Sequence, residues 1–412
     1  MKLTQTAWRN LWRRKRRTII TGVSVGFGVL LSATFTGMGD YMYTNMINTS
    51  ASMGYGHVTV EALGYNQTPT LDKKIRAANT VREQALRLPG VTDAMVRIMG
   101  QAMFASAAKS IGGVFIAIDP AGESPEHNLL MRSIIQGKLF SGTGGRGIVI
   151  GSKMAEKLKL RLGKKLVYTA TDANGEIVSE IARVSGIFKT GSPEIDGGMA
   201  LLPIDSVRAA LHYGPGDASL VAIMIDDQRG AAMIGDGVRA AVGSPNREIL
   251  TWGETQRELA GMIRIDRSAN YLSQFLVGLV IAAGILNTLL MSVLERSREF
   301  GIMMAVGMSP RTLFRLVVLE SFWMAVLGLI IGVIITTPWY LYLVNVGLDF
   351  SGMTGDDYTA AGVIFDPLVR VRLFKESVIA ILAGVFSLTM LSGLYPAWRA
   401  GRIPPVESLR TI

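Results

Sequence analysis

The sequence has no cysteine and only three histidines among its 412 residues. Without cysteine, the chain can form no disulfide, hold no cysteine-ligated metal and use no thiolate nucleophile. The histidines, His57, His127 and His212, are far apart in the sequence, and no carboxylate or second histidine stands at a metal-ligand spacing from any of them. We therefore expect no metal site.

Familiar nucleotide and nucleophile motifs are also lacking. No G-x-x-x-x-G-K-[ST] segment occurs, so the chain does not bind ATP through a P-loop. Gly142–Gly147 fits G-x-G-x-x-G, but its glycines precede the predicted strand 148–150, which favours a flexible surface loop. The letters G-x-S-x-G occur at Gly22–Gly26, but inside the uncharged stretch 18–39 and not at a strand-to-helix turn, so they form no nucleophile elbow. We expect no catalytic residue and no directly bound cofactor, and we interpret the chain as non-catalytic.

Long stretches of the chain lack charge altogether. Residues 18–39, 268–294, 321–348 and 377–398 contain no Asp, Glu, Lys or Arg. Each can cross a hydrocarbon core, which takes about 20 apolar residues. For the first, an uncleaved anchor is favoured over a cleaved signal peptide, because a signal peptide's apolar region has only about 7–15 residues and ends in an A-x-A-like site.

The net charge of +10 collects next to these stretches. Basic residues crowd 13–17 before the first stretch, 296–315 between the second and third, and 399–410 after the fourth. Because cytoplasmic loops carry the excess of Lys and Arg, this distribution favours cytoplasmic termini and disfavours nucleic-acid binding. We predict an integral membrane α-helical protein with four transmembrane helices, N and C termini cytoplasmic, and a large extracytoplasmic α+β domain between the first two.

The predicted order of segments follows from these patterns. It is an amphipathic interface helix at 1–17, a first span at 18–39, the outer α+β domain at 40–267, a second span at 268–294, a cytoplasmic coupling segment at 295–315, a third span at 316–348, a periplasmic loop at 349–376, a fourth span at 377–398 and a cytoplasmic tail at 399–412.

Within the outer domain, apolar alternation and turn residues predict short strands and helices. The predicted strands are 57–61, 111–118, 148–150, 165–171, 177–184, 186–189, 199–203, 220–225 and 248–252. The predicted helices are 72–88, 152–160, 204–211, 229–242 and 253–267. Residues 190–198 are interpreted as a loop, and Asn174-Gly175 as a hairpin turn. The last helix is expected to continue into the second span.

The coupling segment is too short to be a domain. Phe300, Met303, Met304 and Val306 stand at helical spacing, which predicts a small amphipathic helix at the membrane surface. The methionines in and around it suit docking into a partner's groove. The alternative is that these methionines pack under the chain's own membrane helices. Docking is favoured because the segment is too short to bury the methionines on itself.

Glu320 is an acid within the third span. Such residues are commonly functional, but Arg311 and Arg315 are close enough in sequence to form an interfacial ion pair with it, so both interpretations stand. Gly328 and Gly332 form a small-xxx-small spacing in the same span, as Gly22 and Gly26 do in the first, which predicts close helix packing.

Two segments resemble the permeases of type VII ABC systems, the group that contains MacB, FtsX and LolC/LolE. ERSREFGI at 295–302, with Ala305-Val306-Gly307 and then Glu320, is similar to the family's ER-x-x-E-[FI]-G-[IV]…A-[LIV]-G segment and the acid after it. YPAWRAG at 395–401 with PVESLR at 405–410 is similar to the family's ending. Residues 184–200 look most like LolC/LolE-type permeases.

The resemblance implies a cytoplasmic LolD-like ATPase that carries the Mg-ATP, a second permease copy or paralogue, membrane lipids, and a lipoprotein or periplasmic protein as cargo. The residues that it implies for coupling to the ATPase are Glu295, Arg298, Glu299, Phe300, Gly301, Met304, Gly307 and Met308. Those implied for an apolar cargo cavity are Phe27, Leu31, Phe35, Phe275 and Leu279. The outer domain would be porter-like, with an inserted β-rich subdomain at about 137–213.

The function favoured on this resemblance is lipoprotein release from the bacterial inner membrane, driven by ATP hydrolysis on the partner subunit. The hairpin at 171–177 is short and lacks proline, unlike the hook of the chaperone-binding permease, so chaperone docking is not expected. MacB-like export and FtsX-like regulation of a periplasmic partner remain as alternatives. A membrane-anchored enzyme is disfavoured because no catalytic constellation is present.

Overall fold

The structure, a computed structural model, describes residues 3–349, 359–360, 363–364 and 368–402. The described residues divide into two compact units. The helical unit comprises those within Met1–Met42, Ile265–Asp349 and Leu368–Ile412, and the α+β unit comprises those within Tyr43–Arg264 and Phe350–Pro367. Parts of the predicted loop at 349–376, and the tail motif at 405–410, lie outside the described residues.

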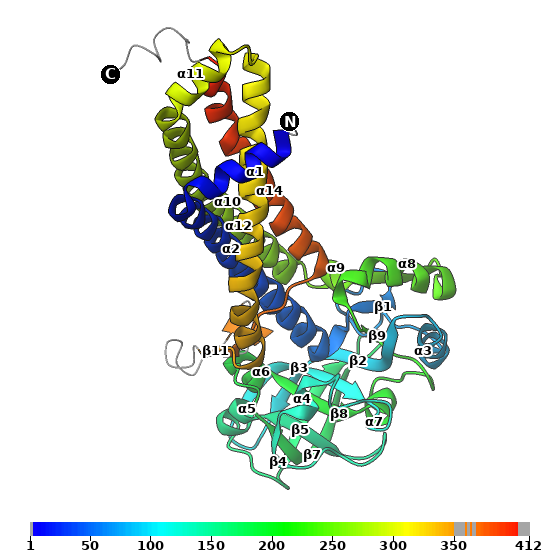
Figure 1. Ribbon diagram of the computed structural model, residues 1–412. Helices are drawn as coiled ribbons and strands as arrows, with labels where there is room; N and C mark the ends of the chain where they lie inside the picture. The colour runs from blue at the N-terminus through cyan, green and yellow to red at the C-terminus, as the bar shows by residue number, and fades with distance from the viewer. Residues whose placement is uncertain (1–2, 350–358, 361–362, 365–367, 403–412) are drawn as a thin grey trace. The chain divides into compact units, whose positions relative to one another are not determined.

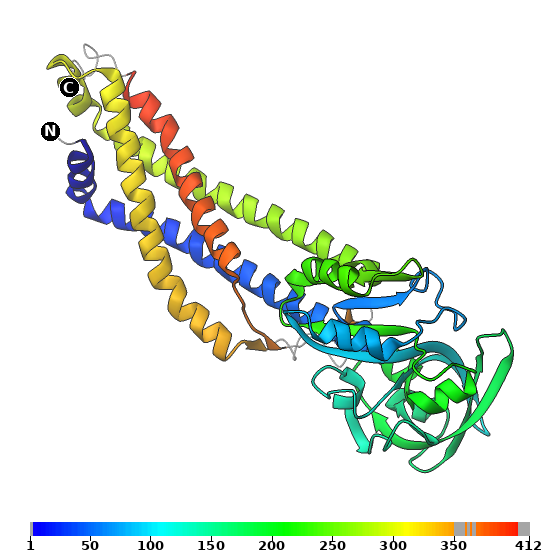
Figure 2. The same cartoon turned by 90° about the vertical axis from the view of Figure 1, so that its right-hand side faces the viewer.

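Long helices build the helical unit (Figure 2). Its elements are α1 (Leu3–Arg13), α2 (Lys15–Ser50), α10 (Arg257–Glu295), α11 (Ser297–Ala305), α12 (Pro310–Asn345) and α14 (Lys375–Ala400), with the short pair β11 (Leu348–Asp349) and β14 (Leu368–Val369). Four helices, α2, α10, α12 and α14, are long and apolar enough to cross a membrane. The prediction of four spanning helices with an α+β region between the first two is confirmed.

The spanning helices extend beyond the uncharged stretches inside them, because charged residues at a membrane surface also favour helix. The first interface helix ends at Arg13, and α2 begins at Lys15, so the basic run at 13–17 is divided between two helices. Pro338 lies inside α12, which continues to Asn345.

Glycines allow α2 and α12 to approach closely. A Cβ added at Gly328 would lie 2.6 Å from the Cβ of Val25, and one added at Gly26 would lie 2.9 Å from the backbone nitrogen of Gly332. Both distances are shorter than atoms tolerate, so these helices pack backbone against side chain and backbone against backbone. Small residues at such crossings are typical of membrane helix pairs.

The α+β unit contains a ten-stranded sheet of order β10-β1-β9-β2-β3-β8-β5-β7-β4, in which β6 pairs with β2 and β7 (Figure 1). Its strands are β1 (Val58–Ala62), β2 (Val91–Ala105), β3 (Ser110–Ile118), β4 (Ile134–Gly137), β5 (Gly147–Gly151), β6 (Lys165–Thr171), β7 (Ile177–Phe188), β8 (Met199–Pro203), β9 (Leu220–Ile225) and β10 (Arg247–Thr251). A separate pair, β12 (Thr359–Ala360) and β13 (Val363–Ile364), completes the described strands.

Short helices cover this sheet. They are α3 (Ala78–Leu86), α4 (Leu129–Arg132), α5 (Ser152–Lys157), α6 (Pro193–Gly198), α7 (Ile204–Ala210), α8 (Ala231–Val242) and α9 (Trp252–Thr255), with the π-helix η1 (Ala51–Tyr55) and the 3-10 turn η2 (Gln228–Gly230). Helix α3 packs on β2 and β9, whereas α8 packs on β10 and β1 (Figure 1). Helices α5 and α6 pack on each other and on β5.

Several predicted elements need correction. No strand was predicted over 91–105, where β2 forms, and strands 177–184 and 186–189 are one strand, β7. The helix expected at 72–88 begins only at Ala78, and residues 193–198 of the expected loop form α6. The helix expected at 253–267 is interrupted at Gln256, between α9 and α10. The predicted bounds of β6, β8 and β9 are confirmed.

The β-rich region expected at 137–213 does not form a sheet of its own. Strand β8 pairs in parallel with β3, and β6 pairs with β2, and both partners lie outside that region. The long strand β2 pairs first with β9 and then with β3 and β6, so it joins the two halves of one sheet.

The two ends of the α+β unit are bonded to each other. The amide of Trp252 donates to the carbonyl oxygen of His57 over 2.8 Å, and the hydroxyl of Ser50 donates to the side chain of Gln256. The chain therefore enters and leaves this unit at neighbouring positions.

Candidate functional site

The candidate site in the helical unit is the turn between α10 and α12, which carries α11. Helix α11 ends at Ala305, and Gly307 follows with a φ of +102°, a conformation that glycine adopts without strain. The Oγ of Ser309 then accepts a hydrogen bond from the amide of Thr312, and Pro310 occupies the first helical position of α12. Local sequence alone therefore fixes where α11 stops and α12 starts.

One face of α11 is buried against the chain's own membrane helices. Phe300 is fully buried in a cluster with residues of α1, α10, α12 and α14, and Gly301 is buried beside it. Phe300 and Gly301, which were predicted to couple to an ATPase, therefore face inward in this structure, and their part in coupling stays a prediction. Met303, Met304 and Met308 are partly buried against the same cluster, so packing accounts for part of each methionine's surface.

The opposite side of α11 is open. Val306 is 84% exposed and Ile302 is 47% exposed, and they stand one turn apart. A groove of about 530 Å³ runs beside them, lined by Met303, Met308 and Thr312 among others. Ile302 was not among the residues predicted on the apolar face of this helix, and Val306 was predicted on the same face as Phe300. Val306 lies on the exposed side of this segment because Phe300 packs into the cluster on the other side, and the local spacing of apolar residues does not specify that packing.

The predicted coupling residues Glu295, Arg298 and Glu299 are exposed, as is Gly307. Glu295 forms ion pairs with Arg14 and, at 3.2 Å, with Arg17. Glu299 lies 3.8 Å from Arg13. Exposed pairs of this kind contribute about 0.2–1 kcal/mol each, so they orient the segment more than they stabilise it.

Glu320 is buried, and its partner is Arg296. The Nη1 of Arg296 donates to both carboxylate oxygens of Glu320, at 3.0 and 3.1 Å, and the Nδ2 of Asn10 donates to Oε1 at 2.7 Å. An ion pair was one of the two interpretations of Glu320, but Arg311 and Arg315, the neighbours considered, are not the partners. The turn through α11 brings Arg296 back over α12, a contact that sequence proximity does not predict.

These side chains surround a polar cavity of about 260 Å³. Asn10 and Arg17 come from the N-terminal helices, Arg296 from the start of α11, and Glu320 from α12. Two segments far apart in sequence, α1 through Asn10 and the start of α11 through Arg296, are thereby bonded to one carboxylate of α12. A displacement of α11 must therefore either break these bonds or move α1 and α12 with it.

The residues predicted to line a cargo cavity lie on α2 and α10. Phe27, Phe35, Phe275 and Leu279 are each exposed by about half or more, and Leu31 is half-buried. Large apolar side chains exposed at this level must face lipid, a cargo chain or a second copy of the chain. Their assignment to a cargo cavity remains a prediction.

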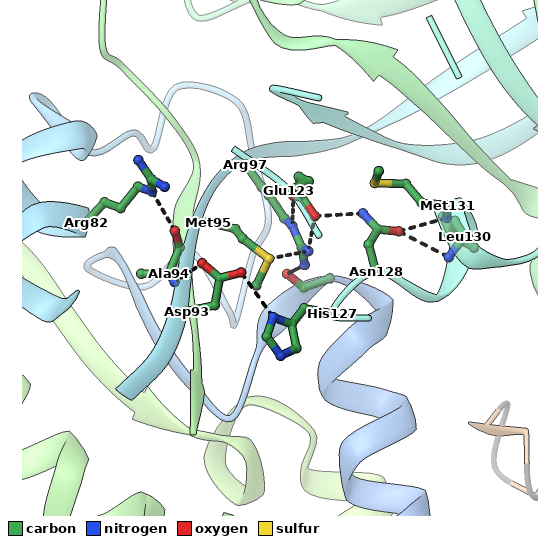
Figure 3. Close-up of polar contacts among 11 residues, drawn as sticks. Arg82, Asp93, Ala94, Met95, Arg97, Glu123, His127, Asn128, Leu130 and Met131 are labelled. Atoms are coloured by element: carbon green, nitrogen blue, oxygen red, sulfur yellow. Dashed lines mark hydrogen bonds and ion pairs between the residues drawn. The ribbon is translucent and has the colours of Figure 1, made fainter. Parts of the chain in front are cut away.

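Within the α+β unit, a buried ion pair holds the segment that follows α2 (Figure 3). Arg97 on β2 donates through Nε and Nη2 to the two carboxylate oxygens of Glu123, at 2.6 and 2.7 Å, and through Nη1 to the carbonyl oxygen of Gly54 in η1, at 2.6 Å. Asn128 donates to Glu123 at 2.9 Å and caps α4 (Figure 3). Both charged side chains are almost completely buried, so each depends on the other.

His57 holds the same region from another side. Its Nδ1 accepts from the amide of Ile225, which leaves Nε2 to donate to Asn48 on α2 at 2.9 Å. Burial, together with a smaller effect of nearby His127, lowers the pKa of His57 to about 4. Sequence reasoning treated His57 only as a possible metal ligand. The lone arginine within the apolar run 94–99 was the one signal for the Arg97 contact.

Comparisons with known proteins agree on one family. Residues 18–241 match the MacB-like periplasmic core domain, and residues 272–405 match the FtsX-like permease C-terminal family. The second match includes α11 and Glu320.

Two curated relatives align over nearly the whole chain. The lipoprotein-releasing system transmembrane protein LolC of Xylella fastidiosa is 22% identical over 408 residues, covering 95% of this chain and 92% of the relative. The pyoverdine export ATP-binding/permease protein PvdT of Pseudomonas fluorescens is 24% identical, covering 99% of this chain and 59% of the relative. The crystal structure of the periplasmic region of MacB from Actinobacillus actinomycetemcomitans aligns at 11% identity over 51% of this chain and 94% of that chain, with a TM-score of 0.35.

Proposed function

We propose a function for this chain from one premise: it belongs to the MacB/FtsX/LolC family of ABC transporter permeases. The proposal is that it is a non-catalytic permease subunit of the bacterial inner membrane. ATP hydrolysis, with its Mg-ATP, takes place on a separate cytoplasmic ATPase subunit. The conformational change driven by ATP hydrolysis is transmitted to the periplasmic α+β unit, whose movement releases lipoproteins from the membrane.

The observation that carries the coupling step is the open side of α11. Ile302 on the nine-residue helix α11 and Val306 directly after it expose apolar surface beside a groove. Apolar side chains on a short helix between two membrane spans suit insertion into a partner's groove. The basic residues around this turn support its cytoplasmic location.

The hydrogen bonds among Arg296, Glu320 and Asn10 support transmission of motion from the ATPase into the membrane helices. Because they join the start of α11 to α12 and α1, a displacement of α11 by the docked ATPase would move these helices with it. In the α+β unit, the bonds of Arg97 and His57 attach the outer end of α2 to the sheet. The proposed path needs both attachments.

The lipoprotein cargo is proposed from the LolC relative, which aligns over most of both chains. The exposed aromatic residues on α2 and α10 would contact the acyl chains or a second permease copy. Export of a soluble substrate is the second candidate, because the PvdT relative covers 99% of this chain.

Replacing Ile302 and Val306 together by serine tests the coupling step. The expected result is that the ATPase no longer co-purifies and that ATP-dependent release of a lipoprotein from proteoliposomes falls at least about tenfold, since burial of each such side chain is worth about 1.5–3 kcal/mol. The matched control is Ile177→Ser, because Ile177 is 78% exposed in the α+β unit and lies outside α11.

Normal co-purification and release in the double variant would refute docking through α11. Mass spectrometry of the purified native complex separates the two cargo candidates. Triacylated peptides bound to the wild-type complex would support lipoprotein release, and their absence together with ATP-dependent movement of a soluble compound would support export.

A further inference from the structure

The beginning of α12 and the end of α14 meet at a pocket whose described charged side chains are all arginines. The pocket has a volume of about 300 Å³. Arg311 and Arg315 line it from α12, Arg402 lines it from the residues just after α14, and Phe314 and Trp398 form apolar walls. Figure 2 shows these two helix ends, yellow and red, together at one end of the helical unit.

The arginines of this pocket lack a counter-charge among the described residues. Arg13, Arg14, Arg17 and Arg296 each pair with a glutamate, whereas none of the three pocket arginines forms an ion pair within residues 3–349 and 368–402. Arg311 and Arg315 are four residues apart on one helix, a spacing at which like charges repel. The N-terminus of the 36-residue helix α12 adds further positive potential.

One of the pocket arginines, Arg402, is also held in position. The guanidinium of Arg402 stacks on the Trp398 ring at 4.2 Å from its centroid. Stacking directs the planar guanidinium group, whose N–H fork matches the spacing of phosphate oxygens. An anion entering the pocket would meet donors from two helices and relieve the repulsion between them.

An apolar stripe leads to the pocket along α14. Leu391, Leu394, Tyr395 and Trp398 follow one another at helical spacing, and each is exposed by between 41% and 63%. Tyrosine and tryptophan near the end of a membrane helix mark the headgroup level. The stripe gives an acyl chain a surface beside an arginine pocket at the depth where phosphate groups lie.

We propose that this pocket binds the phosphate group of an anionic ligand, with the headgroup of an anionic phospholipid as the source that the apolar stripe favours. The site is distinct from the α11 groove and from the Glu320 cluster, and it does not depend on the proposed function. It would hold the ends of α12 and α14 together through a lipid.

The test is lipid binding to the purified full-length chain. After removal of bound lipid, phosphatidylglycerol and phosphatidylcholine are titrated and counted by native mass spectrometry. The wild-type chain should bind phosphatidylglycerol preferentially. Because each arginine near a membrane surface contributes about 1 kcal/mol to anionic lipid binding, the variant R311Q/R315Q should bind at least about tenfold more weakly. The single variant Arg402→Gln should show a smaller loss.

The control R87Q/R161Q removes the same charge from two exposed arginines of the α+β unit, which lie outside the pocket and outside the spanning helices, and should stay within about twofold of wild type. Equal losses in both double variants, or no loss in the pocket variants, would overturn the proposal. Glycerol phosphate is the soluble probe. If it binds as tightly as the lipid and displaces it, the phosphate site stands and the lipid source is wrong.

Discussion

The environment of single residues decides which charges in this chain are structural. Glu320 lies in a membrane helix, yet Arg296 and Asn10 supply hydrogen bonds to its carboxylate. Glu299, 21 residues earlier on α11, is exposed and pairs only weakly. Two acids that both contact Arg296 therefore differ in how strongly the fold depends on each.

Removing one partner of the buried pair should be costly. Glu320→Gln leaves Arg296 without its buried anion and with only the exposed Glu299 as an ion-pair partner. Loss of one buried partner typically costs about 3–5 kcal/mol. The double variant R296Q/E320Q removes both charges and should be less destabilised than the sum of its single changes. Thermal unfolding of the detergent-solubilised chain measures all four species, and strictly additive effects would contradict the pairing.

A second residue-scale prediction concerns Glu61 on β1, which is fully buried. Its pKa is raised to about 8, chiefly by burial and also by Glu248 directly opposite on β10, although the amide of Asn66 donates to it at 2.8 Å and opposes the shift. A carboxyl that holds its proton in the fold and releases it on unfolding stabilises the fold most at low pH. That stabilisation declines as pH rises from the unfolded value, near 4.5, to about 8.

Glu61→Gln should remove this pH dependence. The difference in thermal midpoint between variant and wild type should grow in the variant's favour from pH 5 to pH 8. His57 titrates in the opposite sense but is common to both proteins, so it cancels. The exposed Glu156 supplies the control Glu156→Gln, and parallel curves for wild type and Glu61→Gln would show that Glu61 is ionised in the fold.

At the scale of elements, the close contact between α2 and α12 predicts that two glycine-to-alanine changes shift the thermal midpoint in opposite directions. Gly328→Ala places a Cβ against Val25 and should separate the helices and lower the thermal midpoint. Gly384→Ala on α14 meets no described atom within 4 Å and should raise it, because alanine exceeds glycine in helix propensity by about 1 kcal/mol. Thermal unfolding compares them, and a shift of the same sign in both would contradict the close approach.

Strand β2 shows why one element escaped prediction. From Ala94 to Gly100 every residue is buried, because helices and loops cover both faces of the sheet there. A strand buried on both faces has no alternation of apolar and polar residues. Strands β6, β8 and β9 are short and bounded by clear turn residues, and their bounds were predictable.

For the whole molecule, the sequence predicted four spanning helices and an intervening α+β region, because uncharged stretches and turn chemistry are local properties. It did not predict that Arg296 pairs with Glu320, that Arg97 pairs with Glu123, or that Phe300 faces inward. Each of these depends on segments brought together by the fold. A short helix was predicted between the second and third spans, where α11 lies, but which of its faces is buried depends on three-dimensional packing. Its coupling role stays a prediction.

The bonds from His57 to Trp252 and from Ser50 to Gln256 join the entrance and exit of the α+β unit. A unit whose ends adjoin is, in topological terms, an insertion into a hairpin of two helices. Recombination at these two adjoining ends can lengthen, shorten or exchange the unit without changing the register of either flanking helix. The same membrane machinery can thereby acquire a new external specificity in a single genetic event.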